Sequence, residues 1–385
     1  MIPYGRQDIT QADIEAVVDV LRSDCVTQGP VTPRFEKEVS ARCNAGFGVA
    51  ANSATSALHL ACRALGLGVG DTLWTSPNTF VASANCALHC GAGIDFVDID
   101  PRTYNMSVDA LQRKLASADT QGRLPKVVVP VHFAGQSCDT VGIRRLADSY
   151  GFRVLEDASH AIGGRYKGEP IGNCRYSDIT VFSFHPVKII TTGEGGLAVT
   201  NDGELAARMA RLRNHGITRD PDLMRGEADG PWYYQQVELG WNYRMTDIQA
   251  ALGLSQISRL ESYVRRRHAV ADTYNEALSD LPLVLPYQDA DAYSACHLYP
   301  VQIDRTAIST SREMVFSRLR AAGIGVNVHY IPVHTQPYYR ALGFKTGDYP
   351  AAESYYLNAL SLPIYPTMTP EEQQSVVSAL QLALA

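Results

Sequence analysis

Hydrophobic positions recur along the chain with two different periods, and each period predicts a kind of element. Near the start, Thr10 and Asp13 resemble a helix capping box, and the apolar residues that follow at helical spacing predict a helix over 11–22. Further on, short apolar runs alternate with helical patterns. Several of these runs are apolar on both faces, as expected of strands in a buried parallel sheet, and they cover 95–99, 127–133, 154–156, 179–184 and 197–200. The pattern predicts an α/β domain with helices on both faces of a mainly parallel sheet.

The last third of the chain has a different pattern. One helical pattern without proline runs from Thr246 to about Leu281, and such a long helix commonly links two domains. Within this pattern, the basic run 265–267 predicts a solvated helix face. After it, strands are expected at 297–303 and 325–330, and helices at 311–322 and 370–382. We therefore expect a large domain over 1–245 and a smaller α+β domain, with the linking helix, over 246–385.

Composition narrows the classes of function. The 385 residues carry 34 Lys and Arg against 40 Asp and Glu, a net charge of −6, which argues against a dedicated nucleic-acid binder. No apolar run approaches the roughly 18 residues of a membrane span, and the start lacks a secretory signal, so a cytoplasmic protein is expected. The eight cysteines show neither a CxxC pair nor zinc-ligand spacing, and we expect buried thiols and no metal site.

The segment SFHPVKIITTGEGG, residues 183–196, is the strongest chemical signal. A strand is expected to end near Ser183, and Lys188 follows in a stretch of small and hydroxylic residues that closes on three glycines. Glycines allow a ligand to approach the backbone closely, and lysine is the side chain that forms an imine with a carbonyl cofactor. Alone, a lysine after a strand is usually a solvated surface group.

Its context comes from EDASHA, in which the preceding strand delivers Asp157 at its carboxyl end. Ligands of open α/β sheets lie outside the carboxyl ends of the strands, so Asp157 and Lys188 are expected to lie close together. A carboxylate there would pair with a protonated pyridine nitrogen and help the ring to withdraw electrons. The alternative is that Asp157 caps a helix.

A third signal is ANSATSALHL, in which a polar turn leads directly into an amphipathic helix that is expected to start near Thr55. Free amides at a helix start bind anions, most naturally phosphate. Together with Ser183, the backbone amides of Ala54, Thr55 and Ser56 form a plausible phosphate site.

In this order, the segments resemble the DegT/DnrJ/StrS family of sugar aminotransferases, fold-type I enzymes that use pyridoxal 5'-phosphate. The resemblance covers nearly the whole chain. Its further motifs are PNTFVASANC, LGWNYRMTDIQAALG and VNVHYIPVHTQPYY. Within the family, the motifs are most similar to the aminotransferase type of the pseudaminic acid pathway, which acts on a UDP-linked 4-keto-6-deoxy-N-acetylhexosamine.

The resemblance implies the roles of the cofactor residues. Lys188 would bind the cofactor aldehyde and move the proton, and Asp157 would pair with the pyridine nitrogen. His160 would lie near the phenolic oxygen, where many relatives have Gln, and this leaves open whether the group titrates. Phe80 would stack on the ring, and Asn242 would come from the neighbouring subunit of a homodimer whose active site is shared.

The resemblance also implies a sugar-nucleotide site and an amino donor, L-glutamate. Its sugar-binding residues would be Tyr4, Asp24, Cys25, Val26, Thr27, His185, His329, Tyr330, Ile331 and Pro332. The amine would pass from glutamate to the cofactor and then to carbon four of the sugar. Three alternatives use the same fold: sibling aminotransferases of the bacillosamine, perosamine or 4-amino-arabinose type. A fourth is a catalytically silent protein that binds pyridoxal phosphate.

Overall fold

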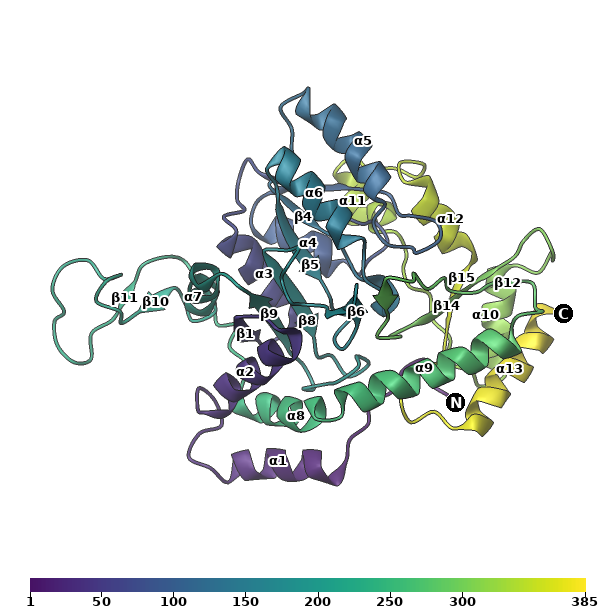
Figure 1. Ribbon diagram of the computed structural model, residues 1–385, viewed down its shortest axis with the longest axis horizontal. Coiled ribbons are helices and arrows are strands. Elements are labelled where there is room, and N and C mark those ends of the chain that lie inside the picture. Colours follow the sequence, from purple (N-terminus) through teal and green to yellow (C-terminus); the bar gives the residue numbers. More distant parts are fainter.

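The computed structural model describes residues 1–385 and is built around a seven-stranded sheet (Figure 1). Its strands, in spatial order, are β1 (Phe47–Ala51), β9 (Gly196–Thr200), β8 (Ile179–Ser183), β5 (Arg153–Asp157), β4 (Val127–Val129), β2 (Thr72–Thr75) and β3 (Gly93–Phe96). Only β9 runs antiparallel to both of its neighbours, and every other adjacent pair is parallel. The α/β fold with a mainly parallel sheet is confirmed.

Helices cover both faces of this sheet because its strands are apolar on both sides. Val181 and Phe182 are consecutive in β8 and fully buried, yet they belong to core clusters on opposite faces. One face is covered by α3 (Ala54–Ala64), α4 (Ala82–His89) and α7 (Gly203–Leu212). The other is covered by α2 (Val31–Cys43), α5 (Val108–Asp119), α6 (Thr140–Tyr150) and α8 (Asp247–Ile257).

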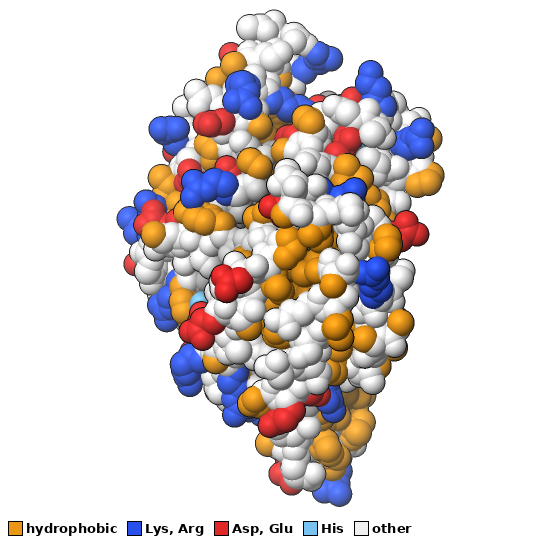
Figure 2. Space-filling model, turned by 90° about the vertical axis from the view of Figure 1, so that its right-hand side faces the viewer, with side chains coloured by type: hydrophobic (Ala, Val, Ile, Leu, Met, Phe, Trp, Pro, Cys, Tyr) orange, Lys and Arg blue, Asp and Glu red, His pale blue; other side chains and the backbone are white.

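The C-terminal part forms a smaller antiparallel sheet with a core of its own. Helix α9 (Leu260–Ala277) leads to β12 (Leu283–Val284), β14 (Tyr299–Ile303) and β15 (Ala359–Leu362), and α10 (Arg312–Ala321) and α13 (Pro370–Leu384) pack beside them. The expected helices at 311–322 and 370–382 are confirmed, as is most of the strand at 297–303. The division into domains at residue 245 stays a prediction. Figure 2 shows this end of the molecule, where Lys and Arg are scattered among acidic side chains rather than gathered in one patch.

The remaining elements are short. They are α1 (Gln11–Leu21), α11 (Pro337–Ala341), α12 (Pro350–Asn358), β6 (Arg165–Tyr166), β7 (Glu169–Pro170), β10 (Ile217–Thr218), β11 (Gln235–Gln236), β13 (Ala292–Tyr293) and the 3-10 turns Phe133–Gly135 and Val333–Thr335. The predicted capping box of α1 is present, since the Thr10 amide donates to Asp13 over 2.8 Å. Strands β10 and β11 belong to a hairpin, residues 214–242, that projects from the body at the left of Figure 1 and is called the arm below. No helix combines the length and hydrophobicity of a membrane span.

The single long helix expected from Thr246 to Leu281 is wrong. Helix α8 ends at Ile257 and α9 begins at Leu260, with Arg259 outside helical geometry. The Arg259 side chain forms an ion pair with buried Asp13 of α1 over 2.7 Å. This contact between distant residues stabilises the break between α8 and α9. Nothing in the local sequence pattern indicates the break.

A further expectation from the same region is wrong, and another is right only in part. Residues 325–330 form no strand, only one bridge between Asn327 and Ser361, because side-chain oxygens take the backbone amides. The Asn327 side chain accepts from the Val328 amide over 2.8 Å, and the Asn78 side chain accepts from the Tyr330 amide over 3.2 Å. In the basic run, Arg265 and Arg266 are exposed as expected, whereas Arg267 is fully buried.

Candidate active site

A cavity of about 590 Å³ opens at the carboxyl ends of β5 and β8. Its position follows from the topology, because loops that leave parallel strands meet at this edge of the sheet. Eleven of the predicted site residues line it: Tyr4, Ala54, Thr55, Phe80, Asp157, His160, Ser183, His185, Lys188, His329 and Tyr330. They come from segments far apart in the chain.

Asp157 is the last residue of β5 and is buried at the floor of this cavity. Its neighbour Glu156 points to the other face of the sheet, where it accepts from Thr180 over 2.7 Å. The Asp157 carboxylate accepts from the hydroxyls of Ser83 and Ser159, both over 2.6 Å, and from the Ser159 amide over 3.0 Å. A carboxylate offers about four acceptor sites, so one is left for a ligand N–H. No helix follows Asp157, and the alternative that it caps one is wrong.

Lys188 lies in the loop between β8 and β9. Hydrogen bonds within the loop hold the loop in its fold. The Thr191 hydroxyl donates to the Phe184 carbonyl over 2.9 Å, and the Thr192 amide donates to the same carbonyl over 3.0 Å. The Lys188 amine makes no hydrogen bond. Burial lowers the pKa of Lys188 to about 8, although Asp157 acts in the opposite direction. An amine with this pKa is partly unprotonated at neutral pH, as a nucleophile must be.

The start of α3 forms the anion-binding end of the cavity. Ser53 caps the helix by accepting from the Ser56 amide over 3.1 Å, so Ser56 is engaged and lies outside the cavity wall. The amides of Ala54 and Thr55 are left without an intrahelical partner. Gly196 of β9 lies so close that a Cβ there would be 2.5 Å from the Ala54 nitrogen, and its register partner Ser183 adds a hydroxyl beside them. These donors fit a phosphate group.

Two histidines of the cavity are kept neutral. Burial lowers the pKa of His160 well below its ordinary value, with Lys188 and His329 acting in the same direction. Burial also lowers the pKa of His329 to about 3. His160 Nε2 lies 3.0 Å from the Tyr330 hydroxyl, and His329 Nδ1 lies 2.8 Å from the Ser361 hydroxyl. Burial therefore favours a neutral imidazole at residue 160 that makes one hydrogen bond, to Tyr330.

The other predicted residues lie apart from this cavity. Asp24 and Cys25 line a separate one of about 660 Å³ between α1, α2 and α8, and Cys25 is the one cysteine of the eight that is exposed. Val26 and Thr27 pair with the start of α8. Ile331 and Pro332 follow Tyr330 but do not line the wall. Asn242 pairs with Asn214 at the base of the arm.

Several residues at the site were not predicted, and three of them bear on its geometry: Ser83, Ser159 and His297. Ser159 could have been found, because Asp-x-Ser is the pattern of an Asx turn, and its amide indeed donates to Asp157. Ser83 lies 74 positions before Asp157, and no local signal joins the two. His297 lines the cavity from the segment before β14, where only a strand was expected.

Comparisons with known proteins identify the family to which this chain belongs. Residues 7–381 match the DegT/DnrJ/EryC1/StrS aminotransferase family. The chain is 41% identical over 383 residues to the spore coat polysaccharide biosynthesis protein SpsC of Bacillus subtilis, with 99% of this chain and 96% of that protein covered.

Solved structures give the same result. Helicobacter pylori PseC, an aminotransferase involved in the biosynthesis of pseudaminic acid, superposes with a TM-score of 0.91 at 29% identity, over 100% of this chain and 99% of that one. The pyridoxamine phosphate form of Spr1654, a putative sugar aminotransferase of Streptococcus pneumoniae, superposes with a TM-score of 0.89 at 31% identity, over 100% and 99%. The chain belongs to the DegT/DnrJ/EryC1/StrS family and is a pyridoxal phosphate-dependent sugar aminotransferase.

Proposed function

We propose that this enzyme transfers the amino group of L-glutamate to carbon four of a UDP-linked 4-keto-6-deoxy-N-acetylhexosamine, as in pseudaminic acid biosynthesis. The observation that carries the proposal is one cavity in which a lysine without hydrogen bonds faces a buried carboxylate with a free acceptor site. The likeness to PseC over the full length of both chains supports the choice of sugar.

The residues of the cavity fit pyridoxal phosphate. When bound, this group carries the amine between the two substrates and withdraws electrons from the carbon that loses its proton. Asp157 would hold the ring nitrogen, and Ser183 with the amides of Ala54 and Thr55 would hold the phosphate. His160 would lie near the phenolic oxygen. Phe80, whose side chain is 59% exposed at the cavity wall, would cover the ring.

Lys188 would move the proton. Its Nζ would take a proton from the α-carbon of glutamate in the first half of the reaction and deliver one to carbon four of the sugar in the second. A group with a pKa of about 8 can both accept and release a proton near neutral pH. Such positioned proton transfer contributes about a hundredfold to ten-thousandfold to a rate.

The sugar nucleotide would occupy the side of the cavity formed by Tyr4, His185, His329 and Tyr330. The ring centroids of Tyr4 and His329 lie 5.4 Å apart, and the two rings form an aromatic wall there. The segment 24–27 and residues 331–332 would contribute at the far end of the nucleotide.

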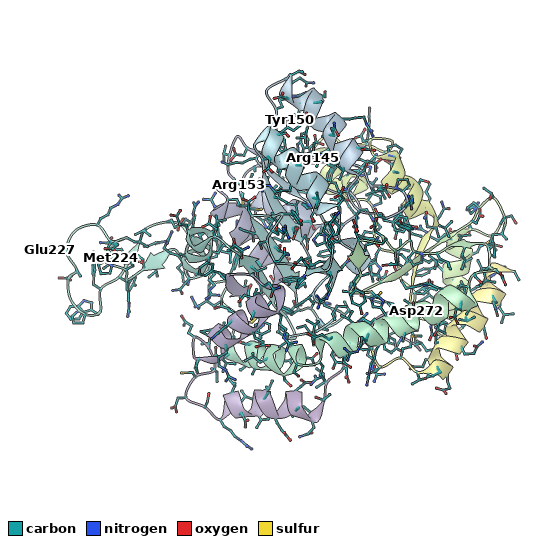
Figure 3. The ribbon with its side chains drawn as sticks, in the orientation of Figure 1. Arg145, Tyr150, Arg153, Met224, Glu227 and Asp272 are labelled. Atoms are coloured by element: carbon teal, nitrogen blue, oxygen red, sulfur yellow. The ribbon has the colours of Figure 1, made fainter.

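A homodimer would complete the site. The arm carries exposed apolar side chains, among them Trp232 at 69% and Leu239 at 71% exposure, which a second copy of the chain would cover. Figure 3 shows Met224 and Glu227 at the far end of the arm, well away from the body. Asn242, at the base of the arm, would reach the cofactor of the neighbouring subunit.

One sibling activity is favoured by a specific observation. The identity to SpsC is 41%, whereas the identity to PseC is 29%. The second candidate is therefore amino transfer to a different nucleotide-linked 4-keto sugar.

The test uses the purified protein loaded with pyridoxal phosphate. The yellow protein should bleach when glutamate is added, and it should then aminate one member of a panel of UDP, GDP and dTDP 4-keto sugars, with the product identified by mass and NMR. Conversion of only a GDP or dTDP sugar would overturn the substrate. Failure to bleach with any amino donor would overturn amino transfer itself.

A further inference from the structure

His297 contacts the site through His160. Both imidazoles are buried, and their ring centroids lie 4.4 Å apart at an angle of 45°. His160 uses Nε2 for Tyr330, and the Nδ1 atoms of both histidines have no partner. The plane of a histidine ring is set by rotation about its Cβ–Cγ bond, and this torsion has broad minima, so a ring packed against its face restricts the plane further.

The backbone of His297 is held from two sides. Its amide donates to the Ala134 carbonyl over 2.8 Å, and the Ala295 amide donates to the Gly135 carbonyl over 3.0 Å. The fit is close, because a Cβ on Gly135 would lie 2.9 Å from the Cys296 nitrogen. The segment at 134–135 and the segment at 295–297 each contain a residue other than glycine in the left-handed region, with φ of 58° at Ala134 and 49° at Cys296. Such conformations are strained at residues other than glycine and cluster at functional sites.

Arg267 of α9 holds the same segment from behind. Its Nη1 donates to three carbonyls, those of Cys296, His297 and Ile364, over 3.3, 3.2 and 3.0 Å. The guanidinium is fully buried without a carboxylate partner, and Nε and Nη2 have no hydrogen bond. Burial lowers the pKa of Arg267 to about 10. A buried cation without an anion is destabilising, and here it fixes the backbone that carries His297.

We infer that His297 is a positioning residue: its ring packs against His160 and fixes the plane in which His160 meets the cofactor, while Arg267 and Ala134–Gly135 hold His297 in place. The inference rests on the proposed place of His160 beside the cofactor. The inferred interaction is a contact between two flat rings. A flat apolar ring at position 297 should therefore still fix the plane of the His160 ring, and a branched aliphatic side chain should not.

The test compares His297→Phe with His297→Leu. Both substitutions fill the space, so both variants are expected to fold, but only Phe keeps a flat face against His160. The matched control is His268→Leu, which removes an imidazole stacked at 4.3 Å on Tyr293 outside the cavity. NMR of the ring nitrogens and carbons of His160 is recorded on each protein without cofactor, and the visible absorbance, cofactor affinity, kcat and KM are recorded with it.

In His297→Leu, the His160 ring signals should shift and broaden, the cofactor dissociation constant should rise about tenfold, and kcat should fall about tenfold with KM for the sugar changed less than twofold. His297→Phe and His268→Leu should match the parent protein within about twofold. Unchanged His160 signals in His297→Leu would overturn the inference, and so would a His297→Phe variant as impaired as His297→Leu. Because the NMR is measured without cofactor, it decides the inference even if the parent protein proves to bind no pyridoxal phosphate.

Discussion

The residues at the strand ends, the segment 24–27 and Asn242 of the arm were all predicted to belong to the active site, but the structure brings together only the first group. In the cavity, Asp157, Ser183 and Lys188 lie together because a sheet fixes where its strands end. The segment 24–27 and Asn242 lie away from it in the single chain. Secondary structure alone places the first group, whereas the second group can reach the site only through a second copy or a ligand.

The largest effect is expected from Lys188→Ala. This variant loses the amine that we propose moves the proton, and turnover should therefore fall by about ten-thousandfold. Single-turnover amination of the sugar, followed by mass spectrometry, measures it. Residual turnover above about 1% of the parent rate would show that another residue of the cavity carries the proton.

Asp157→Asn should reduce kcat/KM by about a hundredfold, because losing one partner of a buried, hydrogen-bonded charge pair costs about 2–5 kcal/mol. The amide keeps the size of the carboxylate and an acceptor for Ser159, so the fold should persist. Cofactor affinity, measured by fluorescence titration, should weaken in parallel. Glu156→Gln, on the opposite face of the sheet, is the matched control and should keep cofactor affinity within about twofold.

The unprotonated fraction of Lys188 should rise about fiftyfold between pH 6 and pH 8 and then level off, because burial lowers the pKa of this amine to about 8. Labelling of the cofactor-free protein with an amine reagent, quantified by peptide mass spectrometry, follows this fraction. Lys167 serves as the internal control: its hydrogen bond to Asp291 raises the pKa of its amine, so its labelling should keep rising above pH 10. If the labelling of both lysines depended on pH in the same way, the lowered pKa of Lys188 would be contradicted.

Asn242→Ala should lower kcat/KM by about tenfold, the usual effect of losing one or two hydrogen bonds to a ligand. Mixing this variant with Lys188→Ala tests whether the site is shared between subunits. A mixed dimer of a shared-site enzyme contains one site with both defects and one intact site, so about half of the parent activity per mixed dimer should return. If the site is not shared, the mixed dimer contains one inactive site and one site with the Asn242→Ala defect. Activity of the mixed dimer at about a twentieth of the parent dimer would therefore show that Asn242 does not act in the neighbouring subunit's site.

The smallest effect is expected from Cys25→Ser. The thiol is exposed in a cavity separate from that of Lys188, so KM for the sugar nucleotide should change less than twofold. Steady-state kinetics on the dimer are sufficient for this comparison. A tenfold rise in KM would show that the segment 24–27 contacts the sugar nucleotide through this side chain.

The sequence could predict what depends on local pattern. The strand that ends at Asp157, the capping box of α1 and the start of α3 all follow from neighbouring residues. Contacts between distant residues could not be predicted. The break between α8 and α9 depends on Asp13, the hydrogen bonds of Asp157 depend on Ser83, and the burial of Arg267 depends on three carbonyls from two other segments.

The reversed direction of β9 has a consequence for the lysine. Two parallel strands must be joined by a long crossover that returns to the opposite edge of the sheet, and an antiparallel pair needs only a direct link. Because β9 runs back from the end of β8, the twelve residues 184–195 stay at one edge, anchored by sheet pairing at both ends. The Lys188 amine is therefore carried by a short loop that is fixed at both ends. Inserting a few glycines into this loop should increase the mobility of the amine without disturbing any other wall of the cavity.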